Sequence, residues 1–197
     1  MVLIIKFPKT LFFKLIVQSF YSIILLTVFT VEARATCDEL CSENWWANSS
    51  LKVIEEKLIS SGNLNIRDNY GFRPLHFAVQ NGEKEKVRLL LSAGVNTNAK
   101  TDYGFTPIYF AVGKKGDLEI IEMLIKSGSL INIKNKNGIT PLHYAAWGTS
   151  NKIISLLNAG ADKNAITKSG KTAFDLALDN EELVDTDAYF LLQKTDE

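Results

Sequence analysis

Cysteine and histidine are scarce in this chain of 197 residues, and neither sign of charge prevails. The chain has 2 cysteines and 2 histidines, and its 22 basic residues balance 22 acidic ones. Two cysteines cannot build a disulfide-rich scaffold, and two histidines leave little material for metal sites. Because no excess positive charge is available to neutralise phosphates, the composition argues against a nucleic-acid-binding protein.

The remaining composition is that of an ordinary globular protein. Apolar residues make up 46% of the chain and charged residues 22%, close to the usual mix. This is ample material for a core, so wholesale disorder is excluded. The length allows one ordinary domain, or at most two small ones.

The N-terminal segment has the pattern of a secretory signal peptide. A cationic start is followed by residues 15–31, which carry no charge, and then by Ala33-Arg34-Ala35. Signal peptidase accepts such a small-x-small pattern after an apolar stretch. We therefore expect residues 1–35 to be a cleaved signal peptide and the protein to be extracytoplasmic, either periplasmic or secreted.

An uncleaved membrane anchor over residues 15–31 is the alternative. Its 17 residues are at the short end of what spans a bilayer, and Gln18, Ser19 and Ser22 make it less apolar.

An internal repeat dominates the rest of the chain. Its four copies align on glycines spaced 33, 34 and 32 residues apart, which are Gly71, Gly104, Gly138 and Gly170. In the first three copies a proline follows three residues after the glycine, at Pro74, Pro107 and Pro141. An apolar run of helical character comes next, and it ends at Gly94, Gly128 or Gly160. Such a period indicates a repeat architecture.

These offsets recur together, and over about residues 50–180 they resemble the ankyrin repeat family. The resemblance implies an all-α solenoid in which helix–turn–helix units, joined by β-turn fingers, stack on one another. We expect an N-terminal capping repeat over residues 36–67, three full repeats over residues 68–166 and a C-terminal capping repeat over residues 167–197.

The residue types suit these positions physically. Glycines such as Gly71 fit a turn that needs positive φ. Thr106 and Thr140 fit helix N-caps, and the prolines that follow them fit the first helical position. We expect three leucines of the second helices to point inward and fill the core between repeats: Leu90, Leu124 and Leu156.

Two repeats depart from the family pattern. Arg73 replaces the capping threonine of the first full repeat, and Tyr109 replaces the usual histidine of the second. In the family this histidine bonds to the backbone and bridges neighbouring fingers, so we expect His76 and His143 to be structural rather than catalytic or metal-binding.

The two ends are expected to act as caps. In the N-terminal cap, residues 37–47 and 51–59 are predicted helices, with Leu51, Ile54 and Leu58 pointing inward. The second helix of the C-terminal cap is expected to present a solvated acidic face, formed by Asp179, Glu181, Glu182, Asp185 and Asp187.

Large side chains at finger and first-helix positions predict a binding surface. In the family, the fingers and the exposed end of the first helix form a concave recognition surface, and aromatic residues dominate binding energetics. The predicted partner-binding residues are Tyr70, Phe72, Gln80, Tyr103, Phe105, Lys114, Lys136 and Trp147. For Phe72 and Phe105, packing against the adjacent finger is an equally open alternative. Phe77, Phe110 and Tyr144 are expected to stack between repeats.

The sequence predicts a non-catalytic protein-binding module without metal or cofactor, monomeric when alone. Its protein partner is not specified by the sequence. Cys37 and Cys41 are predicted to form a disulfide in an oxidising compartment. One alternative is a thiol-redox or envelope stress-protection protein that uses these two cysteines. Another is a secreted effector that acts on host proteins.

Overall fold

The computed structural model describes residue 40 and residues 42–61, 64–113 and 116–193. Contacts along the chain divide it into Met1–Thr36 and Cys37–Glu197, and all described residues belong to the second unit. The predicted signal peptide, both cysteines and Lys114 therefore lie outside the described residues.

The described residues form ten helices and no strand, arranged as five consecutive pairs. The pairs are α2 (Glu43–Asn48) with α3 (Leu51–Ser61), α4 (Pro74–Gln80) with α5 (Lys84–Ser92), α6 (Pro107–Val112) with α7 (Leu118–Lys126), α8 (Pro141–Ala145) with α9 (Ser150–Asn158), and α10 (Ala173–Ala177) with α11 (Asp187–Gln193). None of these helices is both long and apolar enough to cross a membrane.

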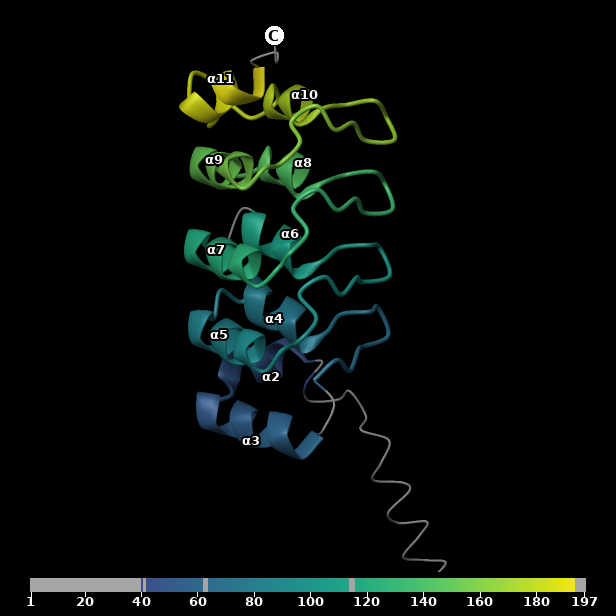
Figure 1. Ribbon diagram of the computed structural model, residues 1–197, viewed down its shortest axis with the longest axis vertical. Helices are drawn as coiled ribbons and strands as arrows, with labels where there is room; N and C mark the ends of the chain where they lie inside the picture. The colour runs from purple at the N-terminus through teal and green to yellow at the C-terminus, as the bar shows by residue number, and fades with distance from the viewer. Residues whose placement is uncertain (1–39, 41, 62–63, 114–115, 194–197) are drawn as a thin grey trace, which may run out of the picture. The chain divides into compact units, whose positions relative to one another are not determined.

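The pairs stack in chain order, and like helices contact like helices. The first helix of each pair packs on the first helix of the next, from α2 through α10, and the second helices pack similarly from α3 through α11. We call these two layers the inner and the outer helices. Long loops, which we call the fingers, project beside the inner helices (Figure 1). The all-α repeat solenoid predicted from the sequence is confirmed.

The inner helices begin where the sequence predicts. Pro74, Pro107 and Pro141 each occupy the first turn of their helix, where the missing amide hydrogen costs nothing. Thr140 caps α8, because its side chain accepts a hydrogen bond from the amide of His143. Thr106 makes no such bond at the start of α6, so the predicted cap is wrong at this position.

The finger glycines are required both by their conformation and by their neighbours. Gly71 has φ +82° and Gly104 has φ +84°, values that residues with a side chain rarely adopt. A Cβ added at Gly71 would lie 2.8 Å from the amide nitrogen of Asp102, and one at Gly104 would lie 3.0 Å from that of Lys136. The fingers can therefore stack this closely only with glycine at these positions.

The core lies between the two helical layers. The three leucines predicted to point inward, Leu90, Leu124 and Leu156, are fully buried. In the N-terminal cap Ile54 and Leu58 are also buried. Leu51 is exposed, so its predicted inward position is wrong: it begins α3, one turn before the first buried residue of that helix, Ile54.

Trp46 fills the core of the N-terminal cap. Trp46 is fully buried, and its indole nitrogen donates a hydrogen bond to the carbonyl of Leu40 over 2.8 Å. The ring of Trp45 stands edge-on to it and is half-buried. The helix that carries both rings, α2, begins at Glu43, later than the predicted start at residue 37.

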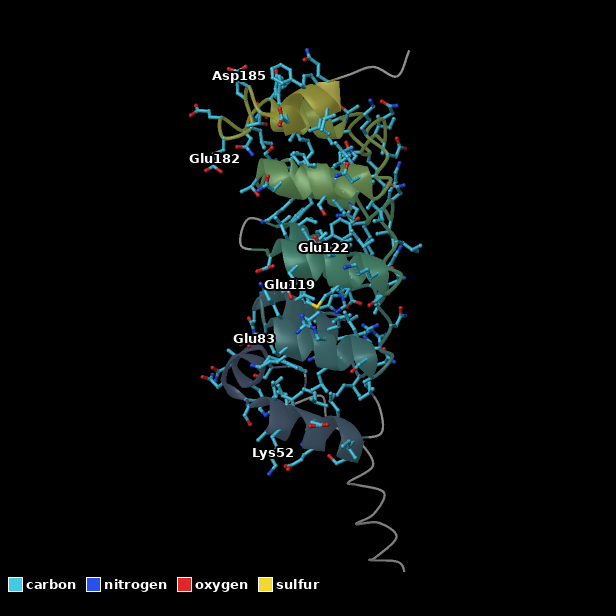
Figure 2. All side chains as sticks on the ribbon, turned by 60° about the vertical axis from the view of Figure 1, so that its left-hand side comes forward. Lys52, Glu83, Glu119, Glu122, Glu182 and Asp185 are labelled. Atoms are coloured by element: carbon cyan, nitrogen blue, oxygen red, sulfur yellow. The ribbon has the colours of Figure 1, made fainter. Side chains whose placement is uncertain are left out.

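The C-terminal cap differs from the prediction in its second helix. Residues 178–186 form turns, and α11 begins only at Asp187. Asp179, Glu181, Glu182 and Asp185 therefore precede the helix, although all four are exposed as expected. Glu182 and Asp185 point away from the stack (Figure 2).

Polar side chains bond to the C-terminal ends of three inner helices from the following repeat. The buried Lys86 and Lys152 donate from Nζ to the carbonyls of Trp46 and Gly113, at the ends of α2 and α6. Asn180 donates from Nδ2 to the carbonyl of Ala146 over 2.9 Å, at the end of α8. Carbonyls at a helix end have no partner within the helix, so these contacts both satisfy them and tie one repeat to the next.

Ion pairs connect the outer helices at the surface. Lys84 and Arg88 of α5 each lie 2.8 Å from a carboxylate oxygen of Glu119 at the start of α7. Glu119 and Glu122 are exposed on the outer layer, as Figure 2 shows. Since exposed pairs contribute little to stability, the buried apolar contacts hold the stack together.

Candidate functional site

The fingers are held to one another by backbone hydrogen bonds at their tips. The amide of Asp102 donates to the carbonyl of Tyr70 over 2.8 Å, and the amide of Lys136 donates to that of Tyr103 over 3.1 Å. The amide of Lys168 donates in the same way to the carbonyl of Asn137 over 3.0 Å. The four fingers therefore form one ladder with a fixed spacing.

Buried side chains on the inner helices anchor this ladder. The Nε2 atom of His76 donates to the carbonyl of Ala99 over 3.0 Å, and that of His143 donates to the carbonyl of Lys171 over 3.1 Å. Each acceptor lies in the finger of the next repeat. The bridging role that the family resemblance implies for both histidines is present in the structure.

Burial keeps both histidines neutral at pH 7. Loss of solvent lowers the pKa of His76 to about 4, against weaker upward contributions from its backbone hydrogen bonds. Desolvation also lowers the pKa of His143. In each ring Nδ1 accepts from a backbone amide, that of Arg73 or Thr140, so Nε2 carries the proton. A neutral ring with both nitrogens occupied has no position left for acid–base chemistry.

Tyr109 takes the histidine position in the second full repeat and anchors the ladder differently. Its ring is fully buried. Its hydroxyl lies 2.6 Å from the carbonyl oxygen of Ile133 and 2.7 Å from that of Ile139. Burial raises the pKa of this hydroxyl, so it stays protonated and donates to the next finger. The substitution therefore preserves the bridge.

A continuous row of aromatic rings runs along the inner helices and the fingers. We call it the aromatic row, and in spatial order it consists of Phe77, Phe72, Phe110, Phe105, Tyr144 and Trp147. Successive ring centroids are between 5.5 and 6.2 Å apart. At such distances aromatic pairs attract one another beyond their area burial. The row crosses three repeats without a gap.

The row remains accessible to solvent along much of its length. Phe77 is buried, whereas Phe72, Phe105, Phe110 and Tyr144 are half-buried and Trp147 is 47% exposed. Contact with the core fixes the half-buried rings, and their remaining surface faces outward. Rigid aromatic groups of this kind lose little conformational entropy when a partner covers them.

The predicted binding residues occupy different environments. Tyr70 and Tyr103 stand at finger tips and are 64% and 61% exposed, and Lys136 is exposed at the next tip. Gln80 is exposed at the last position of α4. Phe72, Phe105 and Trp147 belong to the aromatic row. The structure does not describe Lys114, nor the predicted disulfide of Cys37 and Cys41.

The sequence predicts that Phe77, Phe110 and Tyr144 stack between repeats. Phe77 is buried, whereas Phe110 and Tyr144 keep exposed surface beside Phe105. Each of them follows the bridging residue of its repeat. This position lies beside the fingers. The aromatic residue that recurs there in each full repeat is the sequence signal that indicates an aromatic surface.

Across the described residues, no three histidine, cysteine or acidic side chains come close enough together to hold a metal ion. What the geometry offers is a rigid, partly apolar surface built from stacked helix pairs and laddered fingers.

This architecture is that of a helical repeat protein with β-turn fingers. The family model for ankyrin repeats, which holds three copies of the repeat, matches residues 45–135 and 110–195. The chain therefore belongs to the ankyrin repeat family. Ankyrin repeats are generally protein–protein interaction modules and typically not enzymes. No curated protein matches the chain in sequence.

Proposed function

We propose that this protein binds a protein partner through the face formed by its fingers and inner helices, and that it does so without catalysis. The aromatic row carries this proposal. Six rings in mutual contact span three repeats, and a half-exposed tryptophan ends the row. Buried aromatic anchors dominate the energetics of protein interfaces, and a contiguous apolar surface left open to solvent marks an interaction site.

The exposed finger tyrosines support the same face. Tyr70 and Tyr103 are joined to the following finger through their own carbonyls, so their backbone positions are fixed. Tyrosine offers a large contact area together with a hydrogen-bonding hydroxyl. A partner segment lying along the aromatic row would meet both tyrosines at its edge.

An alanine comparison tests this proposal. The tagged full chain is used to capture partners from its native cells, in parallel with Trp147→Ala and with Ile59→Ala. Ile59 is the matched control, because it is 77% exposed on the outer helix α3. We expect the captured protein to be lost with Trp147→Ala and kept with Ile59→Ala. Equal capture by both variants would exclude the aromatic row as the binding site.

We further propose that residues 1–35 are a signal peptide, which directs export of the protein and is then cleaved off. The cationic start, the uncharged residues 15–31 and the small residues Ala33 and Ala35 support this. The intact mass of the native protein under non-reducing conditions tests it. A mass for residues 36–197 is expected, whereas a full-length mass in the cytosol would contradict export.

A further inference from the structure

The fingers carry a charge that the chain as a whole does not. The loops between the helix pairs, at residues 64–73, 93–106, 127–140 and 159–172, hold eight basic and three acidic residues. The basic residues are Arg67, Arg73, Lys100, Lys134, Lys136, Lys163, Lys168 and Lys171, and the acidic ones are Asp68, Asp102 and Asp162. Since the whole chain is neutral, positive charge is concentrated on the finger side.

The three acids are already engaged locally. Asp68 accepts from the amides of Tyr70 and Phe72 over 2.9 and 2.7 Å, and Asp162 accepts from the amide of Asn164 over 2.9 Å. Asp102 pairs with Arg67 over 2.9 Å. Asp162 is the one carboxylate in the last two fingers, which hold five lysines, so these two fingers remain positively charged.

Three exposed lysines gather on those two fingers. Lys136 stands at the tip of the third, and Lys168 stands at the tip of the fourth. The amide of Lys168 bonds to the carbonyl of Asn137, the residue after Lys136, so the two tips are adjacent. The third lysine is Lys171. None of the three forms an ion pair within the described part of the chain.

Lys171 joins this charge to the apolar surface. It follows Gly170 as Phe72 follows Gly71 and Phe105 follows Gly104, so it continues the same column of finger positions. Its carbonyl accepts the hydrogen bond from His143, the residue beside Tyr144. The fourth finger therefore brings Lys171 into the column of the row, whereas the first two fingers balance Arg67, Arg73 and Lys100 against Asp68 and Asp102.

We infer that the partner segment bound along the aromatic row is acidic and apolar, with carboxylates that meet Lys136, Lys168 and Lys171. This inference rests on the proposed function. Charge complementarity at the edge of an interface steers association and fixes orientation. The apolar side chains of the segment would cover Tyr144 and Trp147. The neutrality of the whole chain favours a short acidic peptide segment over a nucleic acid, which needs an extended basic track.

Selection from a random-peptide display library by the purified full chain tests this inference. We expect the selected peptides to contain more aspartate and glutamate than lysine and arginine, next to apolar residues. Labelled selected peptides should bind about tenfold more weakly to the Lys136→Glu/Lys168→Glu/Lys171→Glu variant. Binding to the wild type should also weaken as salt is raised.

A second triple variant controls for net charge. Lys52→Glu/Lys57→Glu/Lys126→Glu makes the same change in net charge on the outer helices α3 and α7, and it should leave affinity unchanged. Peptides without an acidic excess that bind both variants equally would overturn the inference, as would displacement of the peptides by a single-stranded oligonucleotide. If Trp147→Ala leaves peptide binding intact, the proposed function itself fails.

Discussion

The Tyr109 hydroxyl lies 2.6 Å from the carbonyl oxygen of Ile133, and this contact replaces the histidine bridge of the neighbouring repeats. The replacement leaves another group without a partner. In the third full repeat, Thr140 Oγ1 lies 2.8 Å from His143 Nδ1. Tyr109 offers no ring nitrogen, and the buried Thr106 hydroxyl has no hydrogen-bond partner.

Thr106→Val and Thr140→Val should therefore differ in their effects on stability. Removing the Thr140 hydroxyl deletes a helix cap and a hydrogen bond to histidine, at a cost of about 1–2 kcal/mol in unfolding free energy. Removing the Thr106 hydroxyl deletes a buried polar group that bonds to nothing, so the change should be neutral or stabilising. Urea denaturation of both variants measures the difference. A similar loss in both would show that the Thr106 hydroxyl has a partner in solution.

Stability should fall as the pH drops from about 6.5 to about 4. Since the pKa of His76 is lowered to about 4 in the folded protein, the unfolded state binds the proton more readily in this window. The stabilisation is thus complete above the ordinary histidine pKa, and at most about 3 kcal/mol is lost below the folded pKa. Denaturation at a series of pH values should show this slope, and His76→Gln should reduce it. An unchanged slope in His76→Gln would place its origin elsewhere.

Gly104→Ala should destabilise the protein more than Gly94→Ala. Both glycines have positive φ, +84° and +74°, so both variants pay the backbone strain of about 1 kcal/mol. The new methyl group at residue 104 would also meet the backbone of Lys136 at 3.0 Å, while at residue 94 nothing lies within 4 Å. Thermal unfolding of the two variants compares them directly. Equal melting temperatures would mean that the finger that contains Lys136 can move away from residue 104 without loss of stability.

Asn180→Ala should lower stability by about 1–2 kcal/mol. Its amide donates to the carbonyls of Ala146 and Gly148 over 2.9 and 3.1 Å, so the variant leaves the end of α8 without a donor. Asn151→Ala is a suitable control, because Asn151 is exposed on α9. Chemical denaturation should separate the two, and a control as destabilised as Asn180→Ala would argue against a specific tie between repeats.

Tyr103→Ala and Phe105→Ala should differ in their effects on stability. Tyr103 is 61% exposed, so its removal should leave the melting temperature almost unchanged. Phe105 contacts the rings of Tyr109, Phe110 and Tyr144, and its truncation should cost about 2–4 kcal/mol. Circular dichroism during thermal unfolding reads both effects. A Phe105→Ala variant as stable as the wild type would mean that these ring contacts do not stabilise the fold.

The sequence predicts the repeat fold because its signals are local and recur at fixed offsets. The finger glycines, the first-turn prolines and the inward leucines each follow from one conformational or packing requirement, and the structure confirms them. The failures lie at positions whose surroundings the repeat pattern does not specify. In the repeat whose Thr106 makes no cap bond, Tyr109 stands where His143 bonds to Thr140. Leu51 lies one turn before the first buried residue of α3.

The candidate surface is less predictable from sequence for the same reason. Whether Phe72 or Phe110 is core or surface depends on how closely adjacent fingers approach the inner helices. The structure gives an intermediate answer, since both rings pack on the core and remain partly open. Spacing in the sequence identifies the column in which a residue lies, but not how much of its ring the next repeat covers.

Site-specific photo-crosslinking in native cells shows directly whether a partner covers the aromatic row. A photoreactive amino acid would replace Trp147 on the aromatic row in one sample, and in another it would replace Glu122, which is exposed on the outer helix α7. We expect a covalent adduct with a protein partner from position 147 and none from position 122. An adduct from position 122 alone would contradict this expectation, because the partner would then bind the outer helices.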